Sequence, residues 1–318
     1  MPPADSVLQE AEIVTLHLAE IVSEEPLRVL LVGLGKMGQL HMECLSKMPG
    51  VSLVGIVDED EGKEIAANGI PFARSIDGLA NDFAAAVVAV PVERHAEAAV
   101  PLLARGIDCL VEKPLSLCPG EIETMIAAAR TGGARLSVAQ VERFNPAIES
   151  TMAALRKRSG KVRVQRLSRM QSVAGGPDVI ADLMVHDLDW IVKLEGTSDC
   201  EITVLESRRT AGCLDYVCCR LGFGDRSYEL AAVHGASERK RSLDVRLDGD
   251  ETRCFDLLAL SPDGRPDPLT RQAEVFVMSR AGDAAELATA EEALAVLRLS
   301  DAIRRCAFET SKLPEGAA

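Results

Sequence analysis

The residue types best suited to chemistry in this 318-residue sequence are one lysine and one aspartate–histidine pair. Lys113 follows the apolar run 109–111 and precedes Pro114, which restricts it to an extended conformation and directs it outward at a strand end. Asp182 and His186 are four residues apart, so on a helix they share one face. A carboxylate bonded to an imidazole fixes the tautomer and raises the basicity, which suits proton exchange with an alcohol. Taken singly, a loop lysine or an incidental helical pair would explain each feature equally well.

A glycine-rich segment lies upstream of Lys113. Gly33-x-Gly35-x-x-Gly38 follows an apolar run and opens a helical pattern. In a dinucleotide-binding fold these glycines permit a tight turn, close approach of the pyrophosphate, and helix packing on the strand. Asp58 would accept hydrogen bonds from the adenosine ribose and repel a 2′-phosphate, so the pattern favours NAD over NADP. The expected NAD-binding residues are Gly33, Gly35, Lys36, Met37, Gly38, Asp58, Pro91, His95, Glu112 and Lys113.

The segments around these residues alternate between apolar strands and helices. Strands are predicted at Leu27–Val32, Leu53–Val57, Ala85–Val90, Asp108–Val111 and Leu136–Gln140. Continuous apolar strands separated by helices indicate a parallel sheet covered on both faces. From residue 202 onward, strands follow one another without intervening helices, which indicates an antiparallel sheet. We therefore predict an α/β protein: an N-terminal Rossmann domain with a doubly wound parallel sheet, and a C-terminal α+β domain with a mainly antiparallel open sheet.

Four segments follow from this pattern. We expect an N-terminal appendage over residues 1–26, an NAD-binding domain over 27–143, and a substrate and oligomerisation domain over 144–280. A helical segment over 281–318 is expected to pack back on the body. The helix that carries Asp182 and His186 is predicted over Pro177–Leu194.

Composition excludes several classes of function. The formal net charge of −14 argues against nucleic-acid binding. No apolar run is long enough for a membrane span, and no signal peptide is visible, so we expect a cytoplasmic protein. The nine cysteines show no CxxC pair, which fits reduced thiols. No metal site is expected, because no second histidine lies near Asp182 and His186. The acid-free stretch Arg156–Arg169 is either a solvated face or a source of arginines for a phosphorylated substrate.

Together these motifs resemble the Gfo/Idh/MocA oxidoreductase family over about residues 27–312. The resemblance rests on Gly33–Gly38 with His41, Val90-Pro91 with His95, Val111–Pro114, and Asp182–Asp189. It implies that Lys113, Asp182 and His186 are the catalytic set. In that picture His186 takes the hydroxyl proton, Asp182 orients His186, and Lys113 hydrogen-bonds the reacting oxygen. It also implies a homodimer or homotetramer formed through the open sheet.

A narrower likeness concerns the substrate. Val141–Pro146 with Asp182–Asp187 is similar to the branch that includes UDP-N-acetylglucosamine 3-dehydrogenases and UDP-N-acetylglucosaminuronate oxidases. This implies a nucleotide sugar oxidised at C3 to a ketone, with Arg143 and Asn145 near the sugar and Arg169 near a phosphate. The short segment 171–176 departs from that branch, because it lacks aromatic and basic residues. A free polyol such as inositol is the alternative substrate. A non-catalytic, NAD-responsive regulatory protein on the same fold is the alternative of another class.

Overall fold

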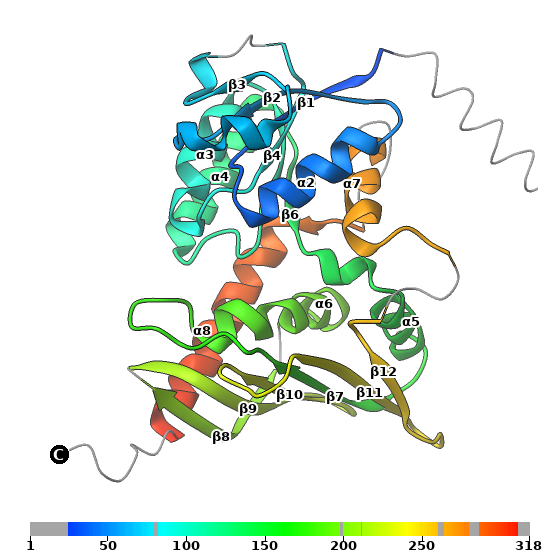
Figure 1. Ribbon diagram of the computed structural model, residues 1–318. Coiled ribbons are helices and arrows are strands. Elements are labelled where there is room, and N and C mark those ends of the chain that lie inside the picture. Colours follow the sequence, from blue (N-terminus) through cyan, green and yellow to red (C-terminus); the bar gives the residue numbers. More distant parts are fainter. Residues whose placement is uncertain are drawn as a thin grey trace, which may run out of the picture.

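The computed structural model describes residues 25–78, 82–197, 200–210, 212–259, 264–279 and 286–310. Most of the expected appendage, residues 1–24, lies outside the described residues, as do 281–285 and 311–318 of the expected C-terminal segment. Two sheets, each with its own helices, lie one above the other, and one long helix runs between them (Figure 1). Within the described residues, no helix combines the length and apolar character needed to cross a bilayer.

The first sheet is the predicted parallel one. Its strand order is β13-β6-β5-β4-β1-β2-β3, and every pairing except that of β13 is parallel. Its strands are β1 (Leu27–Val32), β2 (Val51–Val57), β3 (Phe72–Ala73), β4 (Ala85–Val88), β5 (Asp108–Glu112), β6 (Leu136–Ala139) and β13 (Ala288–Thr289). Successive strands are added on one side of β1 up to β3 and on its other side from β4 onward. Such sheets bind ligands in the crevice at this change of strand order.

Helices cover both faces of this sheet. Leu30 and Leu31 of the central strand are both fully buried, and they belong to the hydrophobic clusters of opposite faces. One face packs against α3 (His95–Ala104) and α4 (Pro119–Gly132). The other packs against α2 (Lys36–Lys47) and α7 (Pro268–Met278). The predicted two-sided burial of apolar strands is therefore confirmed.

The second sheet is mainly antiparallel, as predicted. Its order is β12-β11-β7-β10-β9-β8, and only β7 and β10 run parallel. Its strands are β7 (Gly160–Leu167), β8 (Glu201–Thr210), β9 (Cys213–Phe223), β10 (Arg226–Val233), β11 (Lys240–Leu247) and β12 (Arg253–Asp256). One face packs on α5 (Pro146–Leu155) and α6 (Val185–Glu195). In that core, Trp190 meets Tyr228 edge-on, with ring centroids 5.7 Å apart.

The long helix α8 (Ala290–Thr310) joins the two halves. Its first residues, including Ala293, belong to a core of the parallel sheet, whereas Leu299 and Ile303 belong to the core of the second sheet. Just before it, β13 adds an antiparallel edge strand to β6. A two-residue strand leaves no periodicity in the sequence, and it was not predicted.

Candidate active site

The glycine-rich turn between β1 and α2 has the backbone geometry that a dinucleotide needs. Gly33 has φ of +97°, and a Cβ there would lie 2.6 Å from the backbone of Ala89. At Gly38 a Cβ would lie 2.0 Å from the carbonyl oxygen of Gly33. At Gly35, which caps α2, a Cβ would project into open space. The turn is thus tight on its protein side and open at the helix N-terminus, where a pyrophosphate would sit.

Asp58 closes the β2 end of this crevice. Its Oδ2 accepts a hydrogen bond from the Leu34 N–H at 2.7 Å, and the Lys63 ammonium lies 2.9 Å and 3.0 Å from its two oxygens. Burial alone would raise the pKa of this carboxyl, but the Leu34 and Lys63 contacts hold it below its ordinary value. Lys63 gave no signal in the sequence. Its charge offsets part of the repulsion that Asp58 would exert on a 2′-phosphate.

Glu112 links the strand end at Lys113 to the glycine-rich helix. Its Oε1 lies 2.7 Å from Nε2 of His41, and its Oε2 accepts from the Lys113 N–H at 3.2 Å. His41 and Glu112 are both buried. His41 is one turn beyond Gly38 on α2, so this pair fixes the end of β5 against the helix that would hold the pyrophosphate.

The Lys113 ammonium reaches across to the second half of the chain. Its Nζ donates to the main-chain oxygen of Asp182 at 3.0 Å and lies 3.7 Å from Oδ1 of the same residue. Burial lowers the pKa of Lys113, and the charges of Asp182 and Glu112 offset only part of that effect. The structure therefore brings together Lys113 and Asp182, which lie 69 residues apart in the sequence.

The expected pair of Asp182 with His186 does not form. The predicted helix over 177–194 begins as a π-helix, Ile180–Met184, before it continues as α6. Instead, Oδ2 of Asp182 lies 3.2 Å from Nε2 of His234, whose Nδ1 lies 2.9 Å from the Ser172 hydroxyl.

His186 is buried close to these groups. Its Nδ1 has no hydrogen-bond partner among the described residues. Burial, together with the positive charges of Lys113, Arg166 and Arg241, puts the pKa of His186 well below 6.5. The imidazole is therefore neutral at neutral pH, which is the form that can accept a proton.

A family model of known proteins matches the part of the chain that carries the glycine-rich turn and Lys113. Residues 27–140 match the Gfo/Idh/MocA model, an oxidoreductase family with an NAD-binding Rossmann fold. This part of the chain is therefore similar to the NAD-binding domain of that family.

Individual family members show how wide its chemistry is. The UDP-N-acetylglucosamine 3-dehydrogenase of Acidithiobacillus ferrooxidans is 28% identical over 183 residues, which cover 55% of this chain and 56% of that protein. The inositol 2-dehydrogenase of Leifsonia xyli is 28% identical over 58% of each chain. The alignments thus span little more than half of either relative. A solved structure of the Acidithiobacillus enzyme superposes with a TM-score of 0.78, at 21% identity over 88% of this chain and 97% of that one. At such identity the superposition establishes the fold.

Arg143 and Asn145, two of the predicted site residues, have partners within the protein. Arg143, expected near a sugar, is buried and binds Asp189 through two hydrogen bonds of 2.6 Å and 2.8 Å, and Glu292 at 2.9 Å. Asn145 caps α5 by accepting from the Ala147 N–H at 3.1 Å. Both therefore support the fold, because their polar atoms point to protein groups.

His95 is buried between two loops. Both ring nitrogens of His95 face main-chain oxygens, Nε2 that of Val90 at 3.0 Å and Nδ1 that of Pro114 at 3.1 Å. His95 thus holds two loops together, and its ring nitrogens are not available to a cofactor. Pro91 and Arg169 are exposed. Among the described residues, no group of three His, Cys, Asp or Glu could hold a metal ion.

A buried ion-pair network lies next to His186. Arg166 binds Asp187 at 2.6 Å and Glu142 at 3.2 Å, and Arg241 binds Glu142 at 2.8 Å. Arg166 belongs to the acid-free stretch, but it is neither solvated nor facing a phosphate, because its partners enclose it. The partners Glu142 and Asp187 come from distant segments, so no local pattern in the sequence announces them.

Proposed function

We propose that this protein is an NAD-dependent dehydrogenase that oxidises a secondary hydroxyl group of a sugar or polyol. The observation that carries the proposal is the meeting of Lys113, at the carboxyl end of β5, with Asp182 and the neutral imidazole of His186. Strand ends of a parallel sheet are where such folds bind the nicotinamide and its substrate. Dehydrogenases of sugars and polyols among the family members support the reaction class.

The dinucleotide would be held by the Gly33–Gly38 turn, with Asp58 at the ribose, and when bound it supplies the hydride acceptor. The imidazole of His186 accepts the proton of the substrate hydroxyl, because it is neutral. The Lys113 ammonium donates a hydrogen bond to the reacting oxygen and stabilises the negative charge that develops there. The alcohol thereby loses one proton and one hydride and becomes a ketone.

Asp182 and His234 complete the catalytic set. The main-chain oxygen of Asp182 accepts a hydrogen bond from the Lys113 ammonium, and its carboxylate is hydrogen-bonded to Nε2 of His234. His234 is buried and held from its other side by Ser172. We assign to His234 and Ser172 the role of positioning Asp182, and through it Lys113.

For the substrate we propose a nucleotide sugar of the UDP-N-acetylglucosamine type, oxidised at C3. Support comes from the Acidithiobacillus relative. An inositol-type polyol is the second candidate, favoured by the Leifsonia relative.

The test is an assay of reduced nicotinamide at 340 nm with NAD or NADP and a panel of UDP-sugars, inositols and free hexoses. We expect turnover with NAD, and loss of about 10²–10⁴-fold in kcat for Lys113→Ala and His186→Ala. Lys161→Ala, on the open face of the second sheet, is the matched control and should retain full activity. NAD binding should stay within a few-fold in every variant. NAD binding without oxidation of any panel member would refute the enzyme and favour the regulatory protein.

A further inference from the structure

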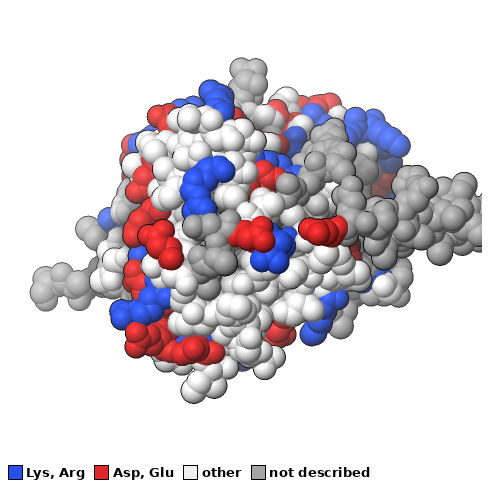
Figure 2. Space-filling model, turned by 90° about the horizontal axis from the view of Figure 1, so that it is seen from above, with Lys and Arg blue, Asp and Glu red and all other residues white. Residues whose placement is uncertain are grey.

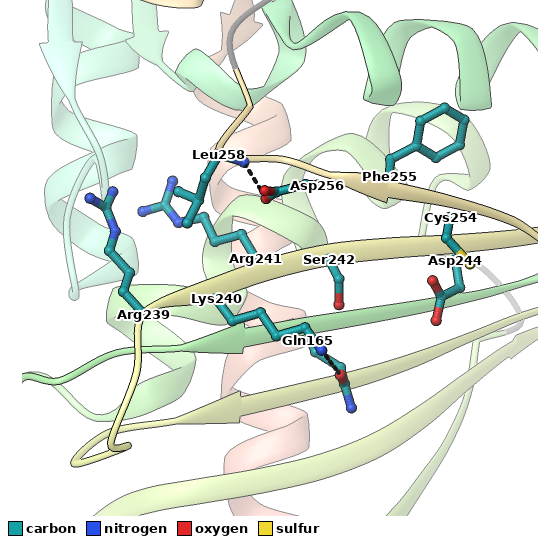
Figure 3. A pocket seen from close by; sticks show the side chains of 10 residues that line it. All are labelled: Gln165, Arg239, Lys240, Arg241, Ser242, Asp244, Cys254, Phe255, Asp256 and Leu258. Carbon is teal, nitrogen blue, oxygen red and sulfur yellow. Dashed lines mark hydrogen bonds between the residues drawn. The ribbon is translucent and has the colours of Figure 1, made fainter.

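A cavity of about 420 Å³ lies along β7, β11 and β12 of the second sheet. Figure 3 shows Arg239 and Arg241 at one end of it, with both side chains extended in the same direction, and Asp244 and Cys254 at the other end. The remaining lining residues are Gln165, Lys240, Ser242, Phe255, Asp256 and Leu258.

The register of the sheet places Arg241 opposite Arg166 on the face that packs against α6, whereas Gln165, Ser242 and Asp244 line the cavity from the open face. The positive charge of Arg241 acts on Lys113, Asp182 and His186. β7 and β10 run parallel and end together, and β11 begins at the same end, with Lys240 opposite Leu167. The connection from β10 to β11 starts with His234, the partner of Asp182, and leads to Arg239. The strand ends that position Asp182 thus also carry the two arginines.

A chain of ion pairs connects Arg241 to the catalytic helix. Arg241 shares Glu142 with Arg166, and Arg166 binds Asp187, the neighbour of His186 in sequence. Glu142 is the only residue that the structure pairs with Arg241 within the described part of the chain, which leaves most of its N–H donors unused. Arg239 is exposed and has no ion-pair or hydrogen-bond partner among the described residues.

We propose that Arg239 and Arg241 bind an anionic oxygen group of the substrate, phosphoryl or carboxylate, while its hydroxyl reacts at Lys113 and His186. Two guanidinium groups with free donors match such a group in charge and geometry. Their nearness supports this reading, since the charge of Arg239 adds to the effects that lower the pKa of Arg241. This inference rests on the proposed function, and it replaces Arg169 as the expected phosphate-binding residue.

Calorimetric titration tests the site without turnover. The protein, saturated with NADH so that the dinucleotide site is filled, is titrated with UDP, inorganic pyrophosphate, glucuronate and myo-inositol. We expect one of the anions to bind, and Arg239→Ala to weaken it about tenfold or more. Arg239→Lys should fall between the two, because it keeps the charge but loses the planar fork. Arg246→Ala is the matched control: Arg246 is exposed on β11, the strand that follows Arg239, but does not line the cavity.

The outcomes separate the two proposals. Binding of UDP or pyrophosphate identifies a phosphoryl group, and binding of glucuronate identifies a carboxylate. Equal anion binding by wild type, Arg239→Ala and Arg246→Ala overturns the anion site. Oxidation of an uncharged polyol without any anion binding also overturns it, while the proposed dehydrogenase stands. Conversely, Arg239-dependent anion binding in a protein that oxidises nothing refutes the dehydrogenase and leaves the anion site in place.

Discussion

The carboxylate of Asp182 lies between two groups from opposite parts of the chain. The Lys113 ammonium is 3.7 Å from Oδ1, and Nε2 of His234 is 3.2 Å from Oδ2. Burial of Asp182 would raise its pKa, but the His234 hydrogen bond and the Lys113 charge hold it below the ordinary value. These two neighbours therefore favour the ionised form of Asp182.

Replacement of His234 tests this dependence. We expect His234→Ala to lower kcat about tenfold, and to shift the acid limb of the kcat profile to higher pH, because Asp182 loses a hydrogen bond that favours its charged form. His234→Gln, whose amide can replace the Nε2 donor, should restore both. A reduced kcat with an unshifted acid limb in His234→Ala would show that the residue only supports the fold.

Three groups set the pH range of activity: Asp182 has to be ionised and His186 neutral, which together fix the acid limb, and Lys113 has to be charged, which fixes the alkaline limb. His186 has to be neutral to accept a proton, and its pKa is well below 6.5, so activity should persist below that pH and fall only in more acidic solution. Lys113 has to be charged to stabilise the reacting oxygen, and its pKa is below 10.5, so activity should decline before that pH is reached. The measurement is kcat against pH at saturating substrate. An acid midpoint at or above 6.5 would contradict the assignment of His186 as proton acceptor.

Among the elements, the turn between β1 and α2 separates folding from cofactor binding. A Cβ at Gly35 meets nothing within 4 Å, whereas one at Gly38 would lie 2.0 Å from Gly33. Gly35→Ala should therefore leave the melting temperature within about 2 °C of wild type and weaken NAD binding, because the methyl group occupies the pyrophosphate space. Gly38→Ala should lower both. The measurements are thermal unfolding without cofactor and titration with NAD. Undiminished NAD affinity in Gly35→Ala would place the pyrophosphate elsewhere.

The elements also show how far the sequence could predict this structure. The strand Ala85–Val88 is a continuous apolar run, and the helix Pro119–Gly132 repeats apolar residues at helical spacing. These sequence patterns were enough to find both elements. The π-helix at Ile180–Met184 could not be predicted, because π and α conformations share the same apolar pattern. Asp182 meets His234, which follows β10, instead of His186. Lys113 was predictable from its strand end and following proline, whereas Lys63 and His234 depend on contacts between distant segments.

At the scale of the whole molecule, charged side chains are arranged differently on the surface and in the interior. The net charge is −14, yet the face seen from above in Figure 2 carries acidic and basic side chains interspersed. Buried arginines are instead used where the two halves meet. Arg143 follows the parallel sheet in sequence, binds Asp189 on α6, and also contacts Glu292 on α8. It thereby connects the catalytic helix to the helix that joins the two sheets.

Removal of Arg143 should therefore affect stability far more than substrate affinity. Asp189 is 1% exposed, so Arg143→Met leaves a buried carboxylate without its partner, at a cost of about 3–5 kcal/mol in the free energy of unfolding. Arg163→Met, which breaks the exposed pair with Glu229, should cost less than about 1 kcal/mol. Urea unfolding measures both. Because Arg143 contacts protein groups only, KM should stay within two- to threefold of wild type. The double variant Arg143→Met/Asp189→Leu should recover much of the lost stability, since it removes the unpaired charge. A large rise in KM with little loss of stability would return Arg143 to the substrate site.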